Sequence, residues 1–133
     1  MRKVEVLVVI LGMALLCVAV AGRGAESQQG RDFYLKFCAS CHGIEGSGNG
    51  PVSKHLKIKP TDLTLLSKKN KGVFPLDQVM TSVDGTRVVR THGEAKMPVW
   101  GEVFEKYDRA EKNPKQAQIK VKAIAEYIST LQR

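Results

Sequence analysis

Residues 38–42 of the chain are Cys-Ala-Ser-Cys-His. Two cysteines separated by two residues and followed directly by a histidine match the attachment signature of a covalently bound haem. Cys38 and Cys41 can each add a thiol across one vinyl group of the porphyrin. His42 can then offer an imidazole nitrogen to the iron. The motif therefore predicts one haem c with His42 as the proximal ligand.

A Cys-x-x-Cys pair also occurs in zinc sites, in thioredoxin-like redox pairs and in disulfides. Zinc requires a second pair of ligands, and no cysteine follows Cys41. A redox pair needs no histidine after its second cysteine and normally lies in a βαβ unit, of which this sequence has no pattern. A disulfide in an exported chain remains as the alternative. Haem accounts for both cysteines and for His42 together.

The first residues of the chain have the three parts of a secretory signal peptide. Arg2 and Lys3 form a positively charged start, and an apolar run over residues 6–20 leads into the cleavage sequence Ala-Val-Ala at 19–21. This run is shorter than the roughly 20 residues of a membrane span, so an uncleaved anchor is the weaker alternative. Cys17 lies inside the run and would be removed with it.

We therefore expect a signal peptide at 1–21, a flexible tail at 22–29 and one domain at 30–133. Export places the protein in the periplasm and changes the meaning of its net charge of +8. Outside the cytoplasm, a basic surface favours an acidic protein partner or an anionic membrane surface over nucleic acid. A domain of this size has a modest apolar core, which a buried haem would complete.

Helical periodicity predicts an all-α fold, without a strand pattern of useful length. We expect an N-terminal helix from about 28–31 to Cys38, and a short helix capped by Thr61. A further short helix follows Pro75 and ends at Gly85. The last helix begins at Asn113-Pro114 and carries one apolar stripe. That stripe consists of Ala117, Val121, Ile124, Ile128 and Leu131. A brief helix through Phe104 is expected to lead into a charged segment at 105–112. The whole stretch 101–113 is long and highly charged, and a solvated spacer is favoured over the alternative of a docking feature.

The sixth position of the iron could take a nitrogen or a sulfur ligand. Met97 is favoured because Pro98 holds the backbone before it extended and because it lies in a loop. Met80 falls on the apolar face of a helix, where methionine normally belongs to the core. His55 lies among lysines and is expected in solvent, and His92 is the second choice. With Met97 as ligand the iron is six-coordinate, which suits electron transfer.

These residues resemble a class I c-type cytochrome of the small monohaem bacterial kind. The resemblance extends from Gly30 to Leu131 and rests on the attachment motif, on Met97-Pro-Val-Trp-Gly101, and on Ala125-Glu-Tyr127-Ile128. It implies that the N- and C-terminal helices of a cytochrome c fold cross, with Gly30 at the crossing. It also implies that the Pro51 carbonyl accepts a hydrogen bond from His42 and that Trp100 belongs to the haem-binding residues.

The resemblance implies a monomeric electron carrier. An enzyme is not expected, because the sequence shows no group of residues typical of a catalytic site. Redox proteins with an acidic docking face are the expected partners, and a membrane would be involved only through an uncleaved leader. Two alternatives are a cytochrome subunit of a periplasmic oxidoreductase and a haem-based ligand sensor with an open iron site.

Overall fold

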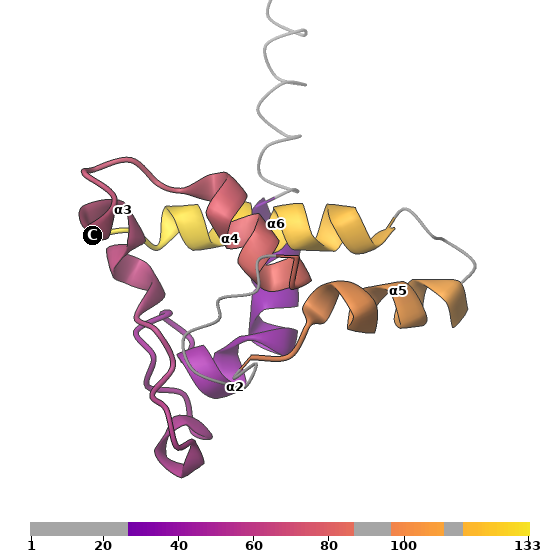
Figure 1. Ribbon diagram of the computed structural model, residues 1–133, viewed down its shortest axis with the longest axis horizontal. Helices are drawn as coiled ribbons and strands as arrows, with labels where there is room; N and C mark the ends of the chain where they lie inside the picture. Colours follow the sequence, from indigo (N-terminus) through magenta and orange to yellow (C-terminus); the bar gives the residue numbers. More distant parts are fainter. Residues whose placement is uncertain (1–26, 87–96, 111–115) are drawn as a thin grey trace, which may run out of the picture.

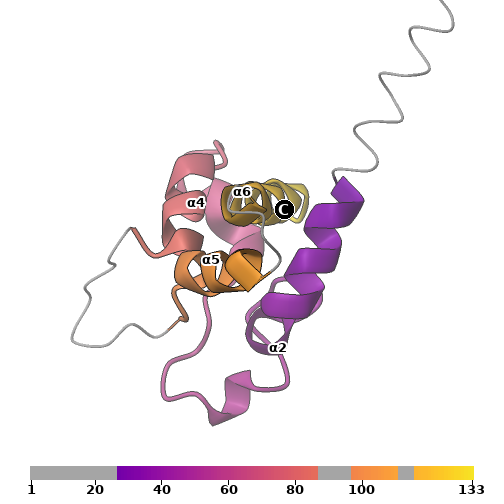
Figure 2. The same ribbon diagram turned by 90° about the vertical axis from the view of Figure 1, so that its right-hand side faces the viewer.

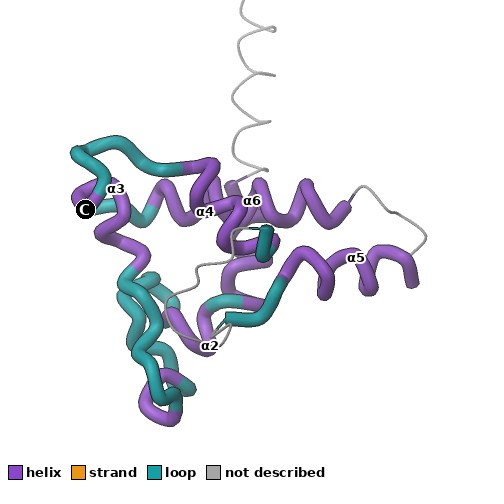
Figure 3. Tube along the Cα trace, viewed as in Figure 1, coloured by secondary structure: helices purple, strands orange, loops and turns teal. Residues whose placement is uncertain are grey.

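The computed structural model describes residues 27–86, 97–110 and 116–133, which are helices joined by loops without a strand (Figure 3). This confirms the all-α expectation. The N-terminal helix covers residues 27–37 of the described chain. The elements that follow are α2 (Ala39–His42), the 3-10 turns η1 (Ser53–His55) and η2 (Leu63–Leu65), α3 (Leu66–Lys69), α4 (Leu76–Asp84), α5 (Trp100–Ala110) and α6 (Gln116–Thr130). The predicted signal peptide and the Asn113-Pro114 cap lie outside the described residues.

The N-terminal helix crosses α6, as the resemblance implied (Figure 1). A Cβ atom on Gly30 would overlap the carbonyl oxygen of Ala123, so only glycine lets the two backbones come this close. One turn further, the rings of Tyr34 and Tyr127 pack with centroids 5.2 Å apart. Residues 27–29 already belong to this helix, close to the start expected at about 28–31.

Gly30→Ala should destabilise the protein despite the higher helix propensity of alanine. At an open helical position the change would raise the free energy of unfolding by about 1 kcal/mol. At Gly30 the added methyl group meets the α6 backbone, and we expect a net loss of about 1–3 kcal/mol. Denaturant unfolding measures the difference, with the exposed Arg31→Ala as the control on the same helix. A gain in stability for Gly30→Ala would contradict the close crossing.

The core lies around α6, with α4 and α5 on one side and the N-terminal helix on the other (Figure 2). The apolar stripe predicted for the last helix is confirmed from Ala117 to Ile128, whereas Leu131 is half-buried just beyond the end of α6. Val121 and Ile124 are fully buried, and Ile128 is 2% exposed. Each such side chain contributes about 1.5–3 kcal/mol when it leaves water. The predicted helix before Gly85 is also confirmed as α4, and Gly85 ends it in the left-handed conformation at φ 83°.

Helix α5 corrects the expectation of a brief helix followed by a charged spacer. It continues to Ala110, through most of the segment that was interpreted as solvated. The cause is the buried side chain of Phe104, whose ring packs against Phe37 and Trp100 at centroid distances of 5.0 and 5.8 Å. Tertiary packing of one aromatic face therefore keeps the charged residues helical.

The long connection from Gly43 to Thr61 forms a lobe that extends away from the helices and carries η1 at its tip (Figure 1). The turn that follows is capped by Asp62, whose side chain accepts a hydrogen bond from the Thr64 amide at 2.9 Å. The sequence predicted Thr61 as this cap. The carboxylate one residue later has the better position, because η2 begins at Leu63.

Candidate haem site

Cys38, Cys41 and His42 lie on a single turn that continues the N-terminal helix. The Cys38 amide donates to the Tyr34 carbonyl at 2.8 Å, and the His42 amide donates to the Cys38 carbonyl at 2.9 Å. The Tyr34 hydroxyl donates to the Gly43 carbonyl at 2.7 Å and so ties the end of α2 back to the N-terminal helix. These bonds give the whole motif one fixed local geometry.

The two cysteines are present as free thiols in different surroundings. Cys38 is 6% exposed within the core, whereas Cys41 is half-buried. Burial, together with the neighbouring Cys41, raises the pKa of the Cys38 thiol to about 12. Cys38 is therefore protonated at neutral pH. The disulfide that remained as an alternative is absent between these two residues.

His42 is 9% exposed, and its Nδ1 atom lies 3.0 Å from the carbonyl oxygen of Thr61. A carbonyl can only accept, so Nδ1 carries the proton of the neutral ring and Nε2 keeps its lone pair. Burial lowers the pKa of His42, and the bond to Thr61 opposes this shift in part. A buried neutral imidazole with a free Nε2 is the form that binds a metal ion.

The acceptor of the His42 hydrogen bond is Thr61 and not Pro51, whose carbonyl was expected from the resemblance. Pro51 is exposed, and the amides on both sides of it donate to carbonyls of α2 instead. The Gly50 amide donates to the Cys41 carbonyl at 3.1 Å, and the Val52 amide donates to the Ser40 carbonyl at 3.0 Å. This turn caps the end of α2 and leaves the imidazole to Thr61. A backbone acceptor has no side-chain signature, so the sequence did not reveal Thr61.

The proposed distal residues lie just before α5 and at its start. Met97 is half-buried against the core. Trp100 is half-buried and packs on Phe37 with ring centroids 5.5 Å apart, which anchors the start of α5 to the N-terminal helix. Ligation by Met97 and contact of Trp100 with haem both stay predictions.

The alternative ligands are distributed differently. Met80 packs on the core from α4, as its helical position indicated. His55 is exposed on η1. His92, the second choice as ligand, lies outside the described residues. Of the axial candidates other than His42, Met97 and Met80 are therefore half-buried and His55 is in solvent.

Several apolar side chains that pack on the core are only partly covered by protein. They pack on the core from several elements but stay half-buried. These side chains are Leu63, Leu66, Phe74, Leu76, Met80, Met97 and Trp100. A porphyrin is a large apolar disc, and it would remove such surface from water. With the two thiols and the free Nε2 of His42, the residues present fit a covalent haem.

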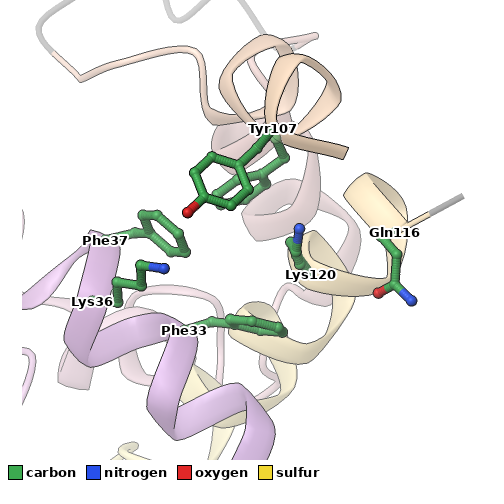
Figure 4. A pocket seen from close by; sticks show the side chains of 7 residues that line it. Phe33, Lys36, Phe37, Tyr107, Gln116 and Lys120 are labelled. Carbon is green, nitrogen blue, oxygen red and sulfur yellow. The ribbon is translucent and has the colours of Figure 1, made fainter. Parts of the chain in front are cut away.

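A cavity of about 300 Å³ lies elsewhere, between the N-terminal helix, α5 and α6 (Figure 4). Its aromatic walls bring Phe37 and Tyr107 together, with the Lys36 ammonium 5.2 and 5.3 Å from their ring centroids. From α6, the Lys120 ammonium lies 6.0 Å from the Phe104 ring centroid and 5.6 Å from the Tyr107 ring centroid. Cys38, Cys41, His42 and Met97 do not line this cavity, so it is separate from the haem site.

An all-α frame whose first long helix ends in two thiols and a neutral imidazole defines a c-type cytochrome domain. A family model described as cytochrome c oxidase, cbb3-type, subunit III matches residues 25–113, which is more than half of the chain. The chain therefore belongs to this family of c-type cytochromes, whose domains carry covalent haem and transfer electrons. Comparison with curated proteins and with solved structures gave no match.

The family match ends before α6, so the crossing of the terminal helices is a finding of the structure itself. Within 27–86, 97–110 and 116–133, no helix combines the length and the apolar character that crossing a bilayer requires.

Proposed function

We propose that this protein is an exported, periplasmic electron carrier with a single haem c, ligated by His42 and Met97. The observation that carries the proposal is the hydrogen bond from His42 Nδ1 to Thr61, because it places the ring proton on Nδ1 and leaves the Nε2 lone pair for the iron. The two thiols on the same turn supply the covalent attachment. When bound, the haem supplies a one-electron Fe(II)/Fe(III) couple.

The residues of the chain hold this couple in a fixed environment. The bond to Thr61 restrains the His42 ring, so the ligand keeps one orientation in both oxidation states. A thioether from Met97 would favour Fe(II) and raise the reduction potential. The half-buried position of Met97 supports this role, since the side chain needs little further burial to reach a ligand-binding position.

The direct test is the spectrum and mass of the exported protein, expressed with a haem-attachment system. We expect one haem that stays with the chain after denaturation, and a mass equal to that of the mature chain plus one haem. The reduced protein should show no spectral change with carbon monoxide. A haem that dissociates on denaturation would overturn covalent attachment, and binding of carbon monoxide would instead favour a ligand sensor.

A second candidate function is a cytochrome subunit of a respiratory oxidase. The observation that favours it is the description of the matching family, which names an oxidase subunit. Gentle membrane solubilisation and size-exclusion chromatography separate the two functions. A free carrier elutes alone at the size of one small domain, whereas a subunit co-elutes with a larger haem-containing complex.

The partner surface that we propose is a basic edge formed by residues 54–71. This segment runs from the tip of the lobe to α3 along one side of the molecule in Figure 1. Its lysines are all exposed, namely Lys54, Lys57, Lys59, Lys68, Lys69 and Lys71. Exposed apolar side chains, among them Leu56 and Ile58, lie between them. Such a surface suits an acidic redox protein with an apolar centre.

Charge reversal on the basic edge should slow the reduction of the physiological acceptor and flatten its salt dependence. Charges at the rim of an interface act mainly on the association rate. For the unmodified protein, the rate should fall steeply once ionic strength passes about 0.1 M, where the Debye length is ~10 Å. In the double variant Lys54→Glu and Lys57→Glu the rate at low salt should fall roughly tenfold.

Stopped-flow transfer kinetics over a range of salt concentrations measure both effects. Lys122→Glu is the matched control, since Lys122 is 62% exposed on α6, outside the basic edge. The haem spectrum should stay the same in all variants. Rates that ignore both salt and charge reversal would show that the edge is an ordinary solvated surface.

A further inference from the structure

The side chain of Gln132 joins two segments that lie far apart in the sequence, the end of α6 and residues 63–67. Its Nε2 atom donates to the Leu63 carbonyl at 2.8 Å and to the Ile128 carbonyl at 2.9 Å. Its Oε1 atom accepts from the Ser67 amide at 2.8 Å. The Gln132 side-chain amide therefore connects the end of α6 with both ends of residues 63–67, which contain η2.

Arg133 forms a second set of bonds to this segment, with Thr64 and Asp62 as its partners. Its backbone amide donates to the Thr64 carbonyl at 3.1 Å, and its Nε atom donates to the Thr64 hydroxyl at 2.9 Å. One terminal guanidinium nitrogen lies 3.3 Å from Oδ2 of Asp62. The Thr64 hydroxyl in turn donates to Oδ1 of Asp62 at 2.6 Å. Figure 1 shows this chain end next to α3.

These bonds restrain the peptide that orients His42. The Thr61 carbonyl, which accepts the Nδ1 proton, directly precedes the capped residue Asp62. On the other side of Thr61, the residues of the lobe from Lys54 to Lys59 are exposed, while the backbone of Gly48 packs against the Pro60–Thr61 peptide. A further restraint comes from the loop after the motif, where the Leu63 amide donates to the Gly46 carbonyl at 2.7 Å.

We propose that Gln132 and Arg133 are positioning residues for the iron ligand. They hold residues 62–67 against the end of α6, and this placement keeps the Thr61 carbonyl at the Nδ1 atom of His42. The inference rests on the proposed ligation by His42. A firm hydrogen bond at Nδ1 makes the imidazole a stronger electron donor and favours Fe(III). Loosening the clamp should therefore raise the reduction potential and expose the Nδ1 proton to solvent.

Gln132→Leu is the decisive variant, because it removes all three hydrogen bonds of the side chain without changing the net charge. We expect a higher reduction potential by equilibrium redox titration, and exchange of the His42 Nδ1 proton by NMR that is at least about tenfold faster. Gln132→Glu keeps the acceptor for the Ser67 amide but adds a negative charge that itself lowers the potential, so only its Nδ1 exchange should be intermediate.

Arg133→Ala tests the bonds of Arg133. The sign of the change in reduction potential separates the loss of a charge from the loss of positioning. Loss of a positive charge alone stabilises the oxidised haem and lowers the potential. Loss of positioning raises it. Lys122→Gln is the control, because it removes one positive charge from a pair with Glu126 on the exposed face of α6. Its proton exchange should match that of the unmodified protein.

Unchanged potential and unchanged Nδ1 exchange in Gln132→Leu would overturn the inference, even if the melting temperature falls. The combination would show that the pair only stabilises the fold. An unmodified protein that lacks covalent haem, or keeps its haem spectrum when His42 is replaced, would instead refute the proposed ligation and this inference with it. The two failures are therefore distinguishable.

Discussion

Replacing Cys38 and Cys41 together with serine should leave an exported chain that does not unfold cooperatively. Without thioether bonds the haem is held only by its axial ligands, and its coverage of the half-buried apolar side chains becomes reversible. A domain of this size has little other core to compensate. We expect loss of the cooperative thermal transition, strong degradation in cells and loss of near-UV circular dichroism.

The alanine pair, Cys38→Ala with Cys41→Ala, should behave in the same way and serves to exclude a polar-burial effect. Cys38 is 6% exposed, so a serine hydroxyl there adds a cost of its own. Ser40→Ala, on the exposed side of the same turn, is the control and should keep haem and stability. A haem-free double variant with a sharp, cooperative melting curve would show that the helices are stable by themselves.

Met97→Ala should change the iron more than any other substitution outside the attachment motif. Loss of the thioether leaves the sixth position open, because the other half-buried sulfur, Met80, packs on the core from α4. The weak near-infrared sulfur-to-iron band of the oxidised protein should disappear, and the reduced protein should bind carbon monoxide. The reduction potential should fall, on the order of 0.1 V or more, since a soft ligand of Fe(II) is lost.

Met80→Leu is the matched control for the ligand assignment, because it removes a half-buried sulfur while keeping an apolar side chain of similar volume. Its near-infrared band and its potential should equal those of the unmodified protein. If the band survives in Met97→Ala, another residue ligates the iron, and His92→Ala in the same background is then the next variant to measure.

Features of the fold that depend on local chemistry could be predicted from the sequence. The attachment motif has a spacing that few other sites share, and Gly30 is found where a Cβ atom would overlap α6. The stripe of α6 repeats at helical spacing, so its burial followed directly. In each case the residue type itself carries the information.

Features that depend on contacts between distant segments could not be predicted. Helix α5 has a charged sequence after Phe104, and only the packing of that ring against Phe37 and Trp100 shows that the helix continues. The role of Thr61 belongs to a backbone carbonyl, which every residue has. The expectation for Pro51 came from resemblance, and here the neighbouring backbone caps α2 instead.

The bonds of Gln132 and Arg133 also set an order of events during folding. They connect residues 65 to 71 positions apart, whereas the attachment turn is closed by bonds within a few residues. Local turns form in about a microsecond or less, and contacts across long loops form later because they must first overcome chain entropy. The thiols can therefore take up haem while most of the chain is still unfolded. The reduction potential of the iron then reaches its final value only after Gln132 and Arg133 have docked against residues 62–67.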